Sequence, residues 1–106
     1  MSAIAIQSIN LVNNQITVHF NQHWFQEDIT NLRQLLLRNV SNLCIKETII
    51  GADLEQVRFQ WLDTEFSVTF DYYSQSCWFD SPDPDSLTKI QLFFNVLNNN
   101  NNESYV

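Results

Sequence analysis

Apolar and polar residues alternate along the chain from Val57 to Phe79, which is the pattern expected of half-buried β-strands. Two-residue turns at Asp63-Thr64 and Ser74-Gln75 divide this stretch into a three-strand antiparallel meander. The expected cross-strand pairs are Trp61 with Phe66, Phe59 with Val68, Val57 with Phe70, Phe70 with Phe79, and Tyr72 with Cys77. Because successive side chains of a strand point to opposite faces, one face is apolar and belongs to the core. The opposite, outer face carries Trp78 beside Asp71.

A second hairpin is predicted at the N-terminus, with strands over Ile4–Leu11 and Gln15–Phe20. Asn13-Asn14 lies between these strands, and asparagine tolerates the positive φ angles that a type I′ turn requires. The turn pairs Leu11 with Ile16 and Ile9 with Val18. The parity of the apolar residues changes within the first strand, so we expect a β-bulge near Gln7 or Ser8.

Two amphipathic helices are predicted where apolar residues recur at spacings of three and four. The first covers Gln26 to Asn39, and its core stripe is Ile29, Leu32, Leu36 and Val40, widened by Leu35. The second starts with Asp83 as N-cap and Pro84 as first helical residue. Its stripe is Leu87, Ile90, Phe94 and Leu97, flanked by Phe93. The polar run from Asn98 onward cannot bury apolar surface, so residues 98–106 are expected to form a disordered tail.

A further strand is predicted over Leu43–Ile50, paired with the meander, with Glu47 on its inward parity near an edge. The element order is then β-β-α-β-β-β-β-α, in a single domain over residues 1–97. We expect an α+β fold with a mostly antiparallel sheet and both helices packed on its apolar face.

The charge of the chain is concentrated in one segment. The net charge is −7, and it arises entirely between residues 53 and 85. The acids there are Asp53, Glu55, Asp63, Glu65, Asp71, Asp80, Asp83 and Asp85, against Arg58 alone, so eight minus one gives seven. An acidic chain does not suit a nucleic-acid partner, which requires Lys and Arg to neutralise phosphates. Acidic side chains either keep an exposed sheet face soluble or steer a basic protein partner toward it.

The sequence offers little support for catalytic or metal chemistry. A single glycine, Gly51, excludes the phosphate-binding loops of nucleotide enzymes. His19 and His23 have a spacing seen in zinc sites, but the other ligands of such a site are missing. Cys44 and Cys77 are expected to be reduced core thiols. We predict no catalytic, cofactor-binding or metal-binding residues.

The chain is also expected to be cytoplasmic and to have no membrane partner. No apolar run approaches the ~20 residues that a membrane-spanning helix needs. The first ten residues lack the basic and apolar regions of a signal peptide.

The outer face of the meander is the candidate site. It gathers residue types that are frequent in binding hot spots, together with carboxylates. The candidate partner surface consists of Arg58, Glu65, Asp71, Tyr73, Trp78 and Asp80. The leading hypothesis is a non-enzymatic protein-interaction domain, of which an inhibitor or immunity-type protein against a basic toxin is one version.

Two alternative functions are compatible with the same sequence. In the first, Trp78 and Tyr73 form the seam of a structural homodimer. In the second, a small-ligand or catalytic pocket lies between sheet and helices and is bounded by Trp24, Trp61 and Phe94.

The segment Asp71–Phe79, DYYSQSCWF, with the hairpin before it and the helix after it, resembles a small uncharacterised bacterial family. Members are cytosolic proteins of roughly one hundred residues, similar in length to this chain. The resemblance covers most of the chain. It implies no known activity, cofactor or catalytic residue.

Overall fold

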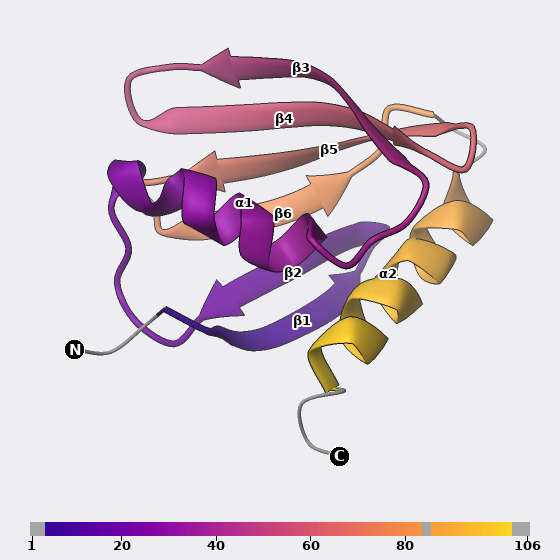
Figure 1. The fold of residues 1–106 in the computed structure, drawn as a ribbon, viewed down its shortest axis with the longest axis horizontal. Helices are drawn as coiled ribbons and strands as arrows, with labels where there is room; N and C mark the ends of the chain where they lie inside the picture. Colours follow the sequence, from indigo (N-terminus) through magenta and orange to yellow (C-terminus); the bar gives the residue numbers. More distant parts are fainter. Residues whose placement is uncertain (1–3, 84–85, 103–106) are drawn as a thin grey trace.

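The structure, a computed structural model, describes residues 4–83 and 86–102 (Figure 1). Its elements are β1 (Ile6–Val12), β2 (Gln15–Phe20), a 3₁₀ turn η1 (Gln26–Asp28), α1 (Ile29–Leu37), β3 (Leu43–Ile50), β4 (Leu54–Trp61), β5 (Thr64–Asp71), β6 (Ser76–Asp80) and α2 (Leu87–Asn102). The predicted α+β class is confirmed, and the elements follow one another in the predicted order. No helix among the described residues is both long and apolar enough to cross a membrane.

The six strands form one antiparallel sheet in the order β1-β2-β6-β5-β4-β3. The chain leaves the N-terminal hairpin through α1, reaches the far edge at β3, and returns to the centre through three consecutive hairpins. There β6 pairs with β2, and Ile16 lies opposite Phe79 and Val18 opposite Cys77. This long-range pairing joins the two predicted hairpin groups into a single sheet.

Both helices cover the same face of the sheet, which we call the inner face (Figure 1). Phe93 of α2 is fully buried among rings of three strands, with centroid distances of 5.6 Å to Phe59, 5.2 Å to Phe66 and 5.3 Å to Phe79. The expected stripe of α2 is therefore partly wrong, because Leu87 is 56% exposed and Phe94 only half-buried. Phe93 fits between the aromatic rings of the strands. The buried side of the helix therefore consists of Ile90, Phe93 and Leu97, and Ser86 just before the helix is buried as well.

The first turn of the meander differs from the predicted one by a shift of register. Leu62 and Asp63 form the turn, with φ angles of 48° and 65°, so that Trp61 lies opposite Thr64. The pairs are then Phe59 with Phe66 and Val57 with Val68. A leucine with positive φ is uncommon, so the sequence pattern did not indicate this turn. Each partner moves by two residues, so the faces stay as predicted while the pairs change.

The second turn is longer than predicted. A four-residue loop, 72–75, joins β5 to β6, and Phe70 lies opposite Cys77 and Val68 opposite Phe79. The side chain of Gln75 anchors this loop to the segment before α1. Its Nε2 donates to the carbonyl of Trp24 at 2.8 Å, and its Oε1 accepts from the Trp24 N–H at 3.0 Å. Trp78 therefore lies beside Thr69 rather than beside Asp71.

The N-terminal hairpin agrees with the prediction. Asn13 and Asn14 have φ angles of 52° and 64°, and Leu11 pairs with Ile16. The register shifts between Ile6 and Ser8, where a bulge was expected.

The helix boundaries differ from the prediction at both helices. The segment from Gln26 starts as the 3₁₀ turn η1 before α1, which ends at Leu37. For α2, Pro84 of the expected N-terminus lies outside the described residues, and the helix begins at Leu87. There the carbonyl of Ser86 accepts the N–H of Ile90 at 2.8 Å. The helix continues through Asn98 to Asn102, five residues beyond the expected end.

A bulge in β3 overturns the expected position of Glu47. The register shifts between Ile45 and Glu47, so Glu47 lies opposite Arg58 on the outer face instead of facing the core. The prediction of core thiols is confirmed for Cys77, which is buried, and wrong for Cys44, which is exposed. Cys44 lies on the edge strand β3, opposite Gln60 of the outer face.

Candidate functional site

The outer face is the side of the sheet opposite α1 and α2, and no helix within residues 4–83 and 86–102 covers it (Figure 1). Strand alternation makes it mostly polar. Its side chains in the four strands that follow α1 are Cys44, Glu47 and Ile49 of β3, Gln56, Arg58 and Gln60 of β4, Glu65, Ser67, Thr69 and Asp71 of β5, and Ser76, Trp78 and Asp80 of β6. An antiparallel sheet tolerates such an uncovered face when the face is polar.

Arg58 is the centre of an ion-pair network across three strands. Its Nη1 lies 2.6 Å from Glu47 Oε1, and its Nη2 lies 2.9 Å from Glu65 Oε2. Its Nε also donates to Glu65 Oε2 at 3.3 Å. The hydrogen bonds that Arg58 donates to Glu65, and then to Glu47, raise the pKa of the Arg58 guanidinium above its ordinary value. The guanidinium is thus held in one orientation by two carboxylates.

Further carboxylates lie beside this network. Asp80 Oδ1 accepts a hydrogen bond of 2.8 Å from the Ser67 hydroxyl. A hollow of about 310 Å³ is lined by Gln56, Arg58, Glu65, Ser67, Asp80, Ser81 and Pro82. A neighbouring hollow of about 480 Å³ is lined by Lys46, Gln60, Asp63, Glu65, Pro82 and Asp83. We call Glu47, Asp63, Glu65, Asp80 and Asp83 the acidic patch; with Lys46 and Arg58 as the cations, five minus two leaves a formal charge of −3.

Trp78 adjoins the acidic patch in the middle of the sheet. It lies between Thr69 of β5 and Thr17 of β2, and it is half-buried. Thr69 is only 3% exposed although it belongs to the uncovered face, because neighbouring side chains shield it. Asp80 follows Trp78 by two residues on the same strand and face, a separation of about 7 Å.

Asp71 and Tyr73 lie apart from Arg58, Glu65 and Asp80. Asp71 is six residues from Glu65 along β5, which is a distance of about 20 Å. Its Oδ1 accepts the Ser74 N–H at 3.3 Å, so it supports the loop between β5 and β6. Tyr73 is in that loop and is 86% exposed. The structure therefore brings together Arg58, Glu65 and Asp80, and Trp78 lies between Asp80 and the pair of Asp71 with Ser76.

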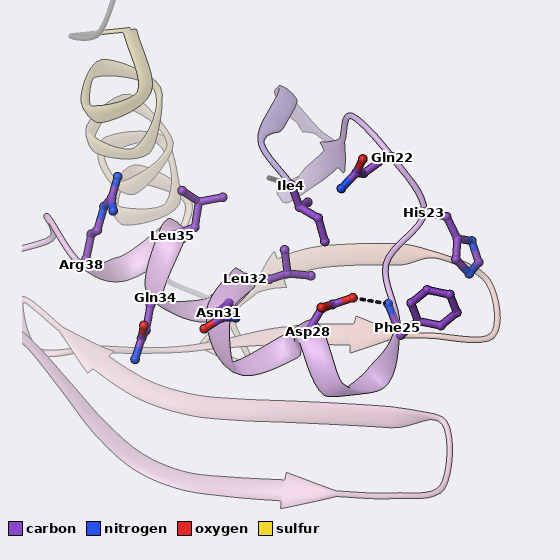
Figure 2. A pocket seen from close by; sticks show the side chains of 10 residues that line it. All are labelled: Ile4, Gln22, His23, Phe25, Asp28, Asn31, Leu32, Gln34, Leu35 and Arg38. Carbon is purple, nitrogen blue, oxygen red and sulfur yellow. Dashed lines mark hydrogen bonds between the residues drawn. The ribbon is translucent and has the colours of Figure 1, made fainter. Parts of the chain in front are cut away.

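A groove beside α1 was not predicted from the sequence (Figure 2). Its volume is about 810 Å³, and it is lined by Ile4, Gln22, His23, Phe25, Asp28, Asn31, Leu32, Gln34, Leu35 and Arg38. Figure 2 shows His23 beside Phe25 at one end and Arg38 at the other, with the amide side chains of Asn31 and Gln34 between them. The groove is assembled from the segment before β1, the connection to α1, and α1 itself. No local pattern joins these segments, although the histidine spacing had drawn attention to His23.

The polar groups of the groove are spread along its length. Asp28 already accepts the backbone N–H of Phe25 at 2.8 Å, and the His23 ring packs edge-on against Phe25 at 4.9 Å. Catalysis requires a base, a nucleophile or an acid directed at one reacting atom. The described side chains of the groove do not converge on one point.

The predicted pocket between sheet and helices does not form around its three expected rings. Trp24 contacts Phe70, whereas Trp61 contacts Phe66, four residues away along β5. Phe94 lines a separate hollow beside the N-terminal hairpin. The inner aromatic residues thus fill the core instead of enclosing a common ligand site.

Fold and surface together define a small α+β domain with an uncovered, acidic sheet face. The chain belongs to the family described as "Protein of unknown function (DUF3630)", whose model matches residues 5–99. The resemblance to an uncharacterised family is thereby confirmed. A search of curated proteins found no match, and a search of solved structures found none either.

Proposed function

We propose that this protein is a non-enzymatic interaction domain that binds a basic protein through Trp78 and the acidic patch. The observation that carries the proposal is a half-buried tryptophan, adjacent to carboxylates of net negative charge, on a sheet face that the described helices leave open. Tryptophan is among the residues most enriched in binding hot spots. Negative potential around it accelerates the approach of a basic partner.

The rigid sheet presents these groups without a cost of ordering them. Arg58 is held by Glu47 and Glu65, and Asp80 by Ser67, before any partner arrives. Side chains that are already fixed lose little conformational entropy on binding. The same contacts argue against general acid–base chemistry, because both Glu47 and Glu65 are well exposed and engaged with Arg58.

The size of the outer face suits a small interface. Six strands spaced by about 4.8 Å, and strands of about 20 Å in length, give a face of roughly 500 Å². Stable complexes bury about 800 Å² on each partner. We therefore expect a transient complex, or one in which the partner also covers part of a sheet edge. We place the protein in the cytoplasm, where its two free thiols stay reduced.

The test compares two matched double variants as baits in affinity purification from the native host. The first, Trp78→Ala with Asp80→Asn, alters the proposed surface. The second, Tyr73→Ala with Asp71→Asn, makes the same kinds of change where β5 leads into the loop 72–75, outside the acidic patch. We expect a basic partner to be captured by the wild type and by the second variant and lost by the first. Capture should also weaken as salt is raised, because exposed charges are screened.

Circular dichroism and thermal unfolding of both variants show whether each remains folded. A partner that the Trp78 and Asp80 variant retains, or that both variants lose equally, would contradict the proposed surface.

A further inference from the structure

The two edges of the sheet are protected to different degrees. At one edge, α2 packs against β1, whose residues alternate between exposed and half-buried. At the other edge, every residue of β3 except Leu43 is exposed. The exposed fractions of its isoleucines are 47% for Ile45, 42% for Ile49 and 69% for Ile50. An exposed apolar edge strand is a template for pairing with another chain.

The backbone of β3 identifies which residues can accept a new strand. The Gly51 N–H donates to the Leu54 carbonyl at 2.7 Å, so this opposed pair is hydrogen-bonded. Hydrogen-bonded and non-hydrogen-bonded pairs alternate along an antiparallel ladder. Ile49 and Glu47 therefore direct their backbone groups toward β4, and Thr48 and Ile50 direct theirs outward. The outward groups lie at exposed residues on the open edge.

The first half of β3 carries the features that block edge pairing, and the second half does not. Lys46 and the bulge between Ile45 and Glu47 interrupt a regular edge. Charged residues and bulges are common protections of natural edge strands. From Glu47 to Ile50 the strand is regular, and its register with β4 is continuous. Only a short segment is thus open to a partner, which favours one defined contact over unlimited association.

We infer that β3 is the seam of a homodimer in which two copies pair residues 47–51 antiparallel around a two-fold axis at Ile49. In this register Thr48 of one copy lies opposite Ile50 of the other, so the outward donors and acceptors match. Ile49 meets its own counterpart on the outer face. Glu47, already bound to Arg58, lies opposite Gly51, which has no side chain to bury it.

Two-fold registers centred on Glu47 or Thr48 are less favourable. An axis at Glu47 places two carboxylates opposite each other, and like charges at opposed positions are destabilising. An axis at Thr48 places Glu47 opposite Ile49. Because the register centred on Ile49 is self-complementary, we expect a second copy of this chain, and not an unrelated strand, to pair with the edge of β3.

The dimer joins two six-stranded sheets into one of twelve and makes their outer faces continuous. It concerns the edge strand and does not rest on the proposed binding by Trp78. Five residues of overlap form a small interface, for which we expect a dissociation constant in the micromolar range.

Sedimentation of the wild type up to about 100 μM tests the inference, and a dimer is expected within this range. Ile49→Lys places two ammonium groups at the axis and should raise the dissociation constant by about tenfold or more. Ile45→Lys is the matched control, because Ile45 is an exposed isoleucine of the same strand that precedes the bulge and lies outside residues 47–51. The Ile45→Lys variant should still form the dimer. A wild type that stays monomeric overturns the inference, and so does a dimer that Ile49→Lys leaves intact.

Cross-linking keeps the test decisive if a lysine variant does not fold. Opposed residues of a non-hydrogen-bonded pair have Cα atoms about 4.5 Å apart, within the range that a disulfide spans. In a Cys44→Ser background, Ile49→Cys should form an intermolecular disulfide under mild oxidation. Ile45→Cys should form it much more slowly. Equal cross-linking at both positions would contradict the register.

Discussion

The two faces of the sheet are made by the same strands and differ in nearly every physical respect. On the inner face, aromatic rings of β4, β5 and β6 surround Phe93 and exclude water. On the outer face, ion pairs and hydrogen bonds join half-exposed side chains such as Arg58 and Glu65. Burial of apolar surface is the dominant favourable term in folding, whereas surface ion pairs add little. The inner face therefore maintains the fold, and the outer face is free to change or to bind.

The cysteines give the largest test of this comparison, since each face carries one. Cys77 is 1% exposed on the inner face, and Cys44 is exposed on the outer face. We expect a thiol reagent to label Cys44 in the native protein and to reach Cys77 only after unfolding. The rate ratio should be on the order of 10³ or more. Mass spectrometry of the labelled peptides measures it, and comparable rates would show that the inner face opens locally.

The same burial predicts a dependence of stability on pH. Burial raises the pKa of the Cys77 thiol well above its ordinary value. Above about pH 8.5 the unfolded chain loses this proton while the folded chain keeps it. The free energy of unfolding should therefore fall as pH rises, by up to about 1.4 kcal/mol per pH unit from this group. Urea unfolding of the wild type and of Cys77→Val, at pH 8 and above pH 9, isolates the contribution of this thiol. If the free energy of unfolding of the variant falls with pH as steeply as that of the wild type, the prediction is contradicted.

Truncation of a ring at the centre of the inner face is expected to lower stability more than any other single substitution proposed for the two faces. Phe93→Ala removes a side chain that is fully buried among aromatic neighbours, and it should lower the free energy of unfolding by about 3–5 kcal/mol. Leu92→Ala, one residue earlier on α2, is the control because Leu92 is 43% exposed, and its cost should stay below about 1 kcal/mol. Urea unfolding monitored by circular dichroism measures both. If both variants lose a similar free energy of unfolding, the side of α2 that carries Phe93 is not the side that packs in the core.

Removal of the central cation of the outer face should have the smallest effect on stability. Arg58→Ala breaks contacts with Glu47 and Glu65 and should lower the free energy of unfolding only slightly, because solvent screens exposed ion pairs. The loss should shrink in 1 M salt, where the Debye length is only about 3 Å. Arg38→Ala, at an exposed position after α1, serves as the comparison. A cost for Arg58→Ala as large as that for Phe93→Ala would remove the distinction between the two faces.

The membership of each face could be read from the sequence because side chains alternate with a period of two along a strand. Arg58, Glu65, Asp71, Trp78 and Asp80 share the outer face as expected for this reason, even though the predicted cross-strand pairs were wrong. A register shift of two residues preserves the face, so the error in both turns did not affect that part of the prediction. The turn at Asn13-Asn14 was also predictable, since asparagine accepts the positive φ angles that it requires.

Contacts between distant segments decided the rest. The pairing of β2 with β6, the bulge that brings Glu47 to Arg58, and the choice of Phe93 over Phe94 for the core all depend on the fit of elements far apart in sequence. A bulge changes the face of every residue beyond it, and both phenylalanines are compatible with a helical period. Alternation along the chain thus determined which residues share a face. The tertiary structure alone determined which neighbours they meet there, because packing and strand register are settled across the sheet and not along the chain.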